Sequence, residues 1–144
     1  MATYDPAAIR AQLKSLLSTA SEVDSANVYD FFNPNINGYP AIVFDISDEQ
    51  NEMLDEANNM RVLVFTIYVI TEIKVAGLDS ATTILDNAVK SITDLLEKRS
   101  NETLGGTVDW VTPVMGKRTQ ANSPEGALIY QEMKVKCSLA SSIL

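Results

Sequence analysis

An acidic segment at residues 45–56 carries the side chains best suited to bind a metal ion. No basic residue lies among its six acidic residues, which are Asp45, Asp48, Glu49, Glu52, Asp55 and Glu56. With Asp45 at position 1 of a calcium loop, Glu49 and Glu56 fall at ligand positions 5 and 12. Gln50, however, replaces the turn glycine required at position 6. We therefore interpret the segment as a solvated connection and expect no metal site.

Two glycine-containing segments have part of the chemistry of a phosphate cradle. Gly105-Gly106 follows a predicted helix and precedes a predicted strand, whereas a phosphate cradle needs a helix to begin directly after it. Gly116-Lys117-Arg118 has the glycine and lysine of a P-loop ending, but the motif requires serine or threonine where Arg118 lies. Neither segment predicts nucleotide binding.

The composition excludes several classes of catalysis. The 144-residue chain contains no histidine, which removes Ser-His-Asp and Cys-His catalysis and imidazole metal ligands. Its single cysteine, Cys137, lies in an alternating apolar run and is predicted to be a buried core thiol. The formal net charge of -8 argues against general binding of nucleic-acid phosphates. We expect a protein that is not an enzyme and needs no cofactor.

The N-terminal residues have neither a basic start nor a continuous apolar stretch, so no signal peptide is expected. The longest apolar run, residues 62–70, is far shorter than the roughly 20 residues that span a bilayer as a helix. The sequence therefore predicts a soluble protein without a membrane partner.

Two amphipathic helices are predicted. Asp5 and Pro6 are suited to begin the first, which continues to Ala20. Asp79 or Ser80 can cap the second. Its apolar positions recur every three or four residues and form one stripe, comprising Ala81, Ile84, Leu85, Ala88, Val89, Ile92, Leu95 and Leu96.

Five strands are predicted from apolar and β-branched runs, at residues 27–32, 39–46, 61–73, 107–114 and 128–139. Polar residues 48–59 and the twelve residues 115–126 are predicted as connections, the latter as an extended loop. The expected fold class is α+β: an antiparallel-rich sheet of four to five strands with two amphipathic helices, in the order αβββαββ. Residues 1–144 are expected to form a single domain.

Both sets of alternating side chains in strand 61–73 are apolar, whereas a one-sided sheet should carry polar residues on its second face. Either the two helices divide between the faces, or another subunit covers one of them. We expect self-association, with an oligomer or partner interface that includes Val62, Val64, Tyr68 and Ile70. The opposite set consists of Leu63, Phe65, Ile67 and Val69, and the register leaves open whether Phe65 and Ile67 of this set lie in the interface instead.

The order of motifs resembles that of the tail terminator (tail completion) proteins of long-tailed bacteriophages. The first matching features are the opening helix 5–20, the segment Tyr39-Pro40-Ala41-Ile42-Val43 leading into a strand, and the long strand 61–73. They are followed by a helix that contains Ile84-Leu85-Asp86-Asn87-Ala88-Val89. The most specific feature is Thr103-Leu104-Gly105-Gly106-Thr107-Val108-Asp109-Trp110-Val111, which precedes a loop and a closing strand. The resemblance covers nearly the whole chain.

The resemblance implies a structural virion protein that forms a homo-oligomeric ring, typically a hexamer, at the head-tail junction. Such a ring caps the tail tube protein and joins it to the head-connector (stopper) protein, in a virion assembled in the host cytoplasm. DNA passes through the ring without sequence-specific binding, and neither catalysis nor a cofactor is implied. The alternatives are another head-tail junction or tube protein, and a small-ligand-binding or enzyme domain on a similar α+β frame.

The predicted loop 115–126 places two adjacent cations, Lys117 and Arg118, in an acidic chain. Two interpretations are open. In the first, the segment is a flexible loop with solvated charges. In the second, it is an arm whose cations contact an acidic surface on a neighbouring subunit or on the tail tube.

Overall fold

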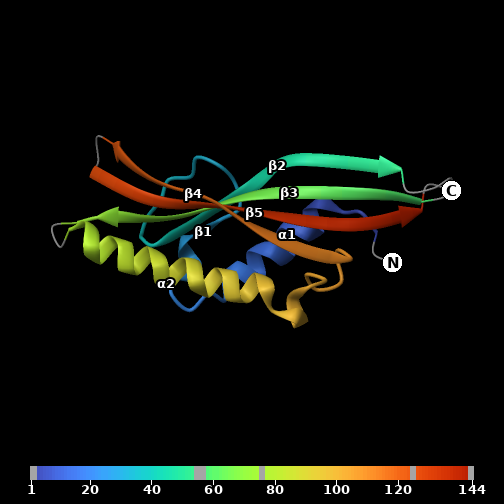
Figure 1. Cartoon of the computed structure of the whole chain (residues 1–144), viewed down its shortest axis with the longest axis horizontal. Coiled ribbons are helices and arrows are strands. Elements are labelled where there is room, and N and C mark those ends of the chain that lie inside the picture. The colour runs from blue at the N-terminus through green and yellow to red at the C-terminus, as the bar shows by residue number, and fades with distance from the viewer. Residues whose placement is uncertain (1–2, 54–57, 75–76, 124–125, 143–144) are drawn as a thin grey trace.

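The chain forms two α-helices and five β-strands. Apolar residues recur every three or four positions in the helices and at every second position in the apolar parts of the strands. The computed structural model describes residues 3–53, 58–74, 77–123 and 126–142 (Figure 1). In chain order the elements are α1 (Pro6–Leu17), β1 (Val28–Tyr29), β2 (Ala41–Met53), β3 (Asn58–Ile73), α2 (Leu78–Glu97), β4 (Trp110–Ser123) and β5 (Gly126–Ser142). Two short 3-10 helices, η1 (Ser25–Asn27) and η2 (Arg99–Asn101), interrupt the predicted order αβββαββ.

The five strands form one mixed sheet in the order β1-β2-β3-β5-β4. All neighbouring strands are antiparallel except β1, which pairs in parallel with β2 through Val28 and Tyr29. The α+β class is confirmed, but the sheet is mixed. The parallel pair arises because the chain crosses over through residues 30–40 before it enters β2, as parallel strands require.

Two segments that were predicted as connections are strands. The acidic residues 48–53 complete β2, where Asn51 pairs with Arg61, and Asp55 and Glu56 lie outside the described residues. Residues 115–123, predicted as part of an extended loop, complete β4, where Thr119 pairs with Tyr130. In both segments, backbone pairing to a strongly predicted strand outweighs the weak strand propensity of the polar side chains.

The helix starts agree with the sequence at α1 and differ at α2. The Asp5 carboxylate accepts a hydrogen bond from the backbone N–H of Ala8 at 3.2 Å, and Pro6 is the first helical residue. The second helix begins at Leu78 after Gly77, whose φ of 94° suits glycine, and not after Asp79 or Ser80 as predicted. Neither described helix is long and apolar enough to cross a membrane.

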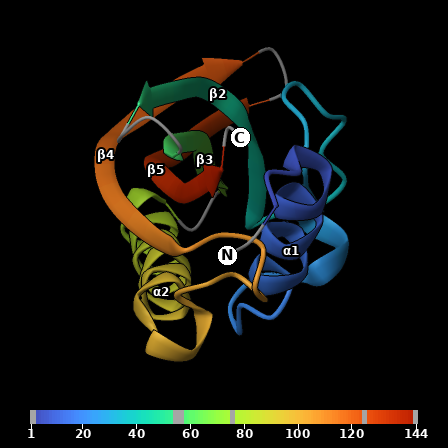
Figure 2. The same ribbon diagram turned by 90° about the vertical axis from the view of Figure 1, so that its right-hand side faces the viewer.

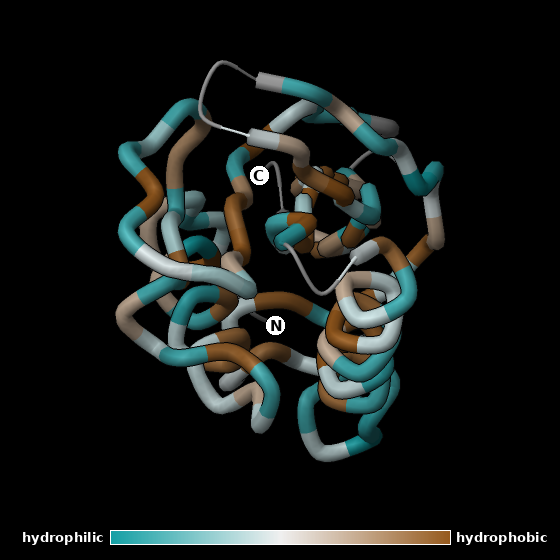
Figure 3. Tube along the Cα trace, turned by 90° about the vertical axis from the view of Figure 1, so that its left-hand side faces the viewer, coloured by the Kyte–Doolittle hydropathy of each residue, from teal (hydrophilic) through white to brown (hydrophobic). Residues whose placement is uncertain are grey.

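Both helices pack on the same face of the sheet (Figures 1 and 2). Figure 3 shows hydrophobic segments of helices and strands turned toward the space between them. Phe44 and Phe65 are fully buried there and pack edge to face, with ring centroids 5.9 Å apart. The core-facing set of β3, which the sequence left open, comprises Leu63, Phe65, Ile67 and Val69.

Cys137 is buried in this core, as predicted, and burial raises the pKa of its thiol to about 12. Because the thiolate is the reactive form, we expect a water-soluble thiol reagent to modify Cys137 only when the protein unfolds. Labelling at neutral pH should therefore accelerate along the urea unfolding transition measured by circular dichroism. Rapid labelling in native buffer would contradict this prediction.

Candidate interaction surface

The sheet face opposite the helices, here called the far face, carries the residues predicted as an interface. Strand alternation places Val62, Val64, Thr66, Tyr68 and Ile70 on this face, because their neighbours along β3 point into the core. Since α1 and α2 both cover the other face, the far face has no helix packed on it in the described chain. Of the two alternatives that the sequence left open, the division of the helices between the two faces does not occur.

A loop from the β1–β2 crossover covers one end of the far face and forms an open groove of about 530 Å³. The rings of Phe32 and Tyr68 meet edge to face at 6.0 Å, and those of Tyr68 and Tyr130 at 5.7 Å. We call this site the aromatic groove; it is lined by Phe32, Asn33, Pro34, Ile36, Val43, Tyr68, Ile70 and Tyr130.

Tyr68 at the base of the aromatic groove is half-buried and lies beside Glu132 and Tyr130. Burial first, and then the negative charge of Glu132, raises the pKa of the Tyr68 phenol. The phenol therefore stays protonated at neutral pH and offers an apolar ring with a hydroxyl group. Such a surface suits recognition of a partner through apolar contact and hydrogen bonding.

The four predicted interface residues of β3 occupy different environments. Tyr68 and Ile70 line the aromatic groove, and Val62 is half-buried farther along the strand. Val64, by contrast, is only 5% exposed within the single chain. Beside it, Ser47 donates a hydrogen bond to the Val64 carbonyl and accepts one from Thr66. A charge at position 64 would therefore disturb the fold as well as any interface.

The two predicted cations of β4 are also in different environments. Lys117 is exposed at a bulge between Met115 and Arg118. The Arg118 guanidinium donates to the Asp86 carboxylate on α2 and, at 3.0 Å, to the Gln131 side chain. Arg118 therefore joins the β4–β5 hairpin to α2. The predicted extended loop does not form in residues 115–123, which belong to β4, and residues 124–125 lie outside the described part of the chain.

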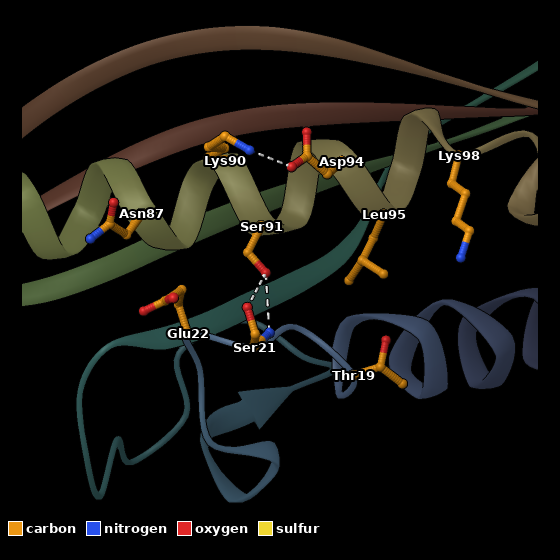
Figure 4. A pocket seen from close by; sticks show the side chains of 9 residues that line it. All are labelled: Thr19, Ser21, Glu22, Asn87, Lys90, Ser91, Asp94, Leu95 and Lys98. Carbon is orange, nitrogen blue, oxygen red and sulfur yellow. Dashed lines mark hydrogen bonds and ion pairs between the residues drawn. The ribbon is translucent and has the colours of Figure 1, made fainter.

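Two further surfaces carry polar groups of the kind that chemistry needs. In the acidic segment, burial opposes ionisation of the Asp45 carboxyl group. The Arg10 guanidinium lies 2.7 Å from an Asp45 carboxylate oxygen, and together with backbone N–H groups it holds the pKa of Asp45 below its usual range. No group of three potential metal ligands gathers within the residues that the structure describes. A polar groove of about 430 Å³ between the α1–η1 segment and α2 brings Ser21 and Ser91 together, and their hydroxyl groups hydrogen-bond to each other rather than to the carboxylates and amines that also line the groove (Figure 4).

The comparisons with known proteins add a likeness in fold. The sequence matches no protein-family model and no curated protein. The structure is similar to a chain in "Virion of native gene transfer agent (GTA) particle", with a TM-score of 0.50 and 17% identity. The match covers 94% of each chain. The two chains share a fold.

Sequence reasoning missed two parts of the far face. The first is the loop with Phe31 and Phe32, because these residues were predicted as the end of strand 27–32, whereas β1 ends at Tyr29. The second is a pair of exposed lysines on β5, Lys134 and Lys136, with the exposed Trp110 and Val114 on β4 beside them. The strict alternation of apolar and polar residues in β5 was a signal that could have placed these lysines.

The role of Arg118 can be tested against its neighbour Lys117. We expect Arg118→Leu to lower the free energy of unfolding by about 1–2 kcal/mol, because Asp86 and Gln131 both lose a charged donor. Lys117→Leu should change it by less than about 0.5 kcal/mol. Urea unfolding followed by circular dichroism measures both values, and equal effects of the two substitutions would contradict this assignment.

Proposed function

We propose that this chain is a structural protein of a phage-type virion and acts by assembling with copies of itself and with other virion proteins. The fold shared with a gene transfer agent virion chain over 94% of both chains carries the proposal. The far face supports it, because an open aromatic groove without a covering helix is typical of a surface that a partner buries.

Within the virion, we propose that the chain is a tail terminator. Copies of the chain, six being the expected number, form a ring at the end of the tail tube. This ring joins the tube to the head connector. The order of motifs along the sequence supports this role. The net charge of -8 is compatible with a ring through which DNA passes without sequence-specific binding.

We also propose that the role is not enzymatic. The described hydroxyl groups of Ser21 and Ser91 hydrogen-bond to each other and to no carboxylate or amine, and burial raises the pKa of the Cys137 thiol to about 12. These groups therefore lack the activation that a nucleophile needs at neutral pH.

Electron microscopy tests the proposed function. Antibody-labelled particles from the producing host should carry the label at the junction between head and tail, and the purified chain should yield rings. Label spread along the tail tube would instead indicate a tube protein. Label absent from particles would overturn the virion role.

A further inference from the structure

One wall of the aromatic groove is the crossover loop, residues 30–38, which leads from β1 toward β2. Within this loop, no backbone group hydrogen-bonds to another backbone group of the described chain. The ring of Phe32 nevertheless lies 6.0 Å from that of Tyr68, and Val43, which also lines the groove, is only 4% exposed. Side-chain contacts must therefore hold the loop against the sheet.

Arg10 of α1 makes the closest of these contacts. Its guanidinium donates a hydrogen bond to the backbone carbonyl of Asp30, where the loop begins. It also lies 2.7 Å from a carboxylate oxygen of Asp45 on β2. The side chains of Arg10 and Asp45 are 28% and 25% exposed, so water screens this ion pair only in part. One cation thus connects a helix, the crossover loop and a strand.

The ion pair between Arg10 and Asp45 crosses the outer edge of β2. Asp45 belongs to the far face, because it pairs with the far-face residue Thr66 of β3. Arg10 lies on α1, which packs on the other face. The strand β1 ends opposite Val43, so the rest of β2 has no strand on its outer side in the described chain, and a bulge follows Ile46. Arg10 therefore reaches the far face from the helix side through an open part of the sheet edge.

Asp45 also lies beside the backbone of the loop. Burial opposes ionisation of its carboxyl group, but Arg10 and the backbone N–H groups of Ile46 and Phe32 hold the pKa of Asp45 below its usual value. The Ile46 N–H donates at 2.7 Å. Phe32 thus approaches Asp45 with its backbone and Tyr68 with its ring.

Two other contacts hold the crossover loop less closely. The Lys14 ammonium group lies 3.8 Å from the Asp30 carboxylate, and the Lys14 side chain is 46% exposed. At the far end of the loop, the Asn37 backbone N–H donates to the Tyr29 hydroxyl at 3.0 Å. Neither contact joins the loop to β2.

We propose that Arg10 is a positioning residue that fastens the crossover loop, so that the shape of the aromatic groove is set from the helix side of the sheet. With its guanidinium in place, the Phe32 ring stays on Tyr68. A partner that buries the groove then meets a wall that is already ordered, which lowers the entropic cost of binding. This inference concerns the free chain and holds whichever partner covers the groove.

A cysteine under the loop can measure how often the loop opens. Val43→Cys places a small thiol at a groove position that is 4% exposed, where a bulky thiol reagent reacts only when the loop moves away. The natural Cys137 is 1% exposed in the core and reports unfolding of the whole chain in the same sample. Mass spectrometry of peptides from the full-length protein separates the two labelling rates.

In this background, we expect Arg10→Met to raise the labelling rate at position 43 at least about fivefold, because two hydrogen-bonded contacts of a partly buried cation are lost. Lys14→Met removes the same charge from the same helix and should change this rate by less than about twofold. Arg118→Leu destabilises the other side of the sheet, and should raise labelling of Cys137 without changing the rate at position 43.

Asp45→Asn provides an independent measurement, because it leaves Arg10 in place and removes only the charge that Arg10 contacts. It should also raise the rate at position 43, and the double variant R10M/D45N should label no faster than Arg10→Met, since both changes break one network. Equal effects of Arg10→Met and Lys14→Met, or effects of Arg10→Met and Asp45→Asn that add, would overturn the proposal. Labelling at position 43 that is already fast before either change would also overturn it. These rates are measured on the purified chain, so they are independent of the location of the chain in a virion.

Discussion

Tyr68→Glu should leave the chain folded and prevent its incorporation into particles. In the free chain the aromatic groove is open, so a carboxylate at position 68 remains hydrated. When a partner covers the groove, that carboxylate is buried without a cation, beside Glu132. Burial of an unpaired charge costs about 3–5 kcal/mol, which weakens the contact more than a hundredfold.

The measurement is the fraction of heads joined to tails in a host whose native protein is replaced by the variant. Circular dichroism of the purified variant checks that the fold is retained. Ile84→Glu is the matched control, because it also introduces a carboxylate at an apolar position, 41% exposed on α2. A Tyr68→Glu variant that joins heads to tails at the wild-type level would show that the groove is not an interface.

Phe65→Ala should lower the free energy of unfolding by about 3–5 kcal/mol, the largest effect expected from a single core substitution. The Phe65 ring is fully buried between the sheet and the helices and packs against Phe44. Its loss removes apolar burial and leaves a cavity that the neighbouring strands cannot fill without moving.

Urea unfolding at a fixed temperature measures this loss, with Phe31→Ala as the matched control. Phe31 is 51% exposed, so its truncation should change stability by less than about 0.5 kcal/mol. Similar losses in the two variants would mean that the core is not organised around the Phe44–Phe65 pair.

The sequence allowed the helices and the apolar strands to be predicted because their periods are strong. Asp5 begins α1 through a local hydrogen bond, and the buried stripe of α2 was readable from its spacing. Alternation separates the two sets of β3 side chains, but only the packed helices show which set faces the core. These features depend on interactions within a few residues or on a single repeated period.

The missed features depend on contacts between distant residues. The polar ends of β2 and β4 are strands because they pair with β3 and β5, and their own side chains do not indicate this. Arg118 was predicted to lie in an extended loop, because the sequence cannot show that Asp86 lies beside it. The aromatic groove likewise requires the crossover loop to lie against Tyr68 and Tyr130.

The interrupted sheet edges also affect copies that have not yet assembled. Open edges are the usual starting point of aggregation and fibril growth through strand addition. Here Pro113 and the bulge after Met115 limit such addition on β4, and the bulge after Ile46 limits it on β2. If the chain assembles as proposed, free copies can therefore remain dispersed at high concentration, because backbone pairing at these edges does not by itself join them.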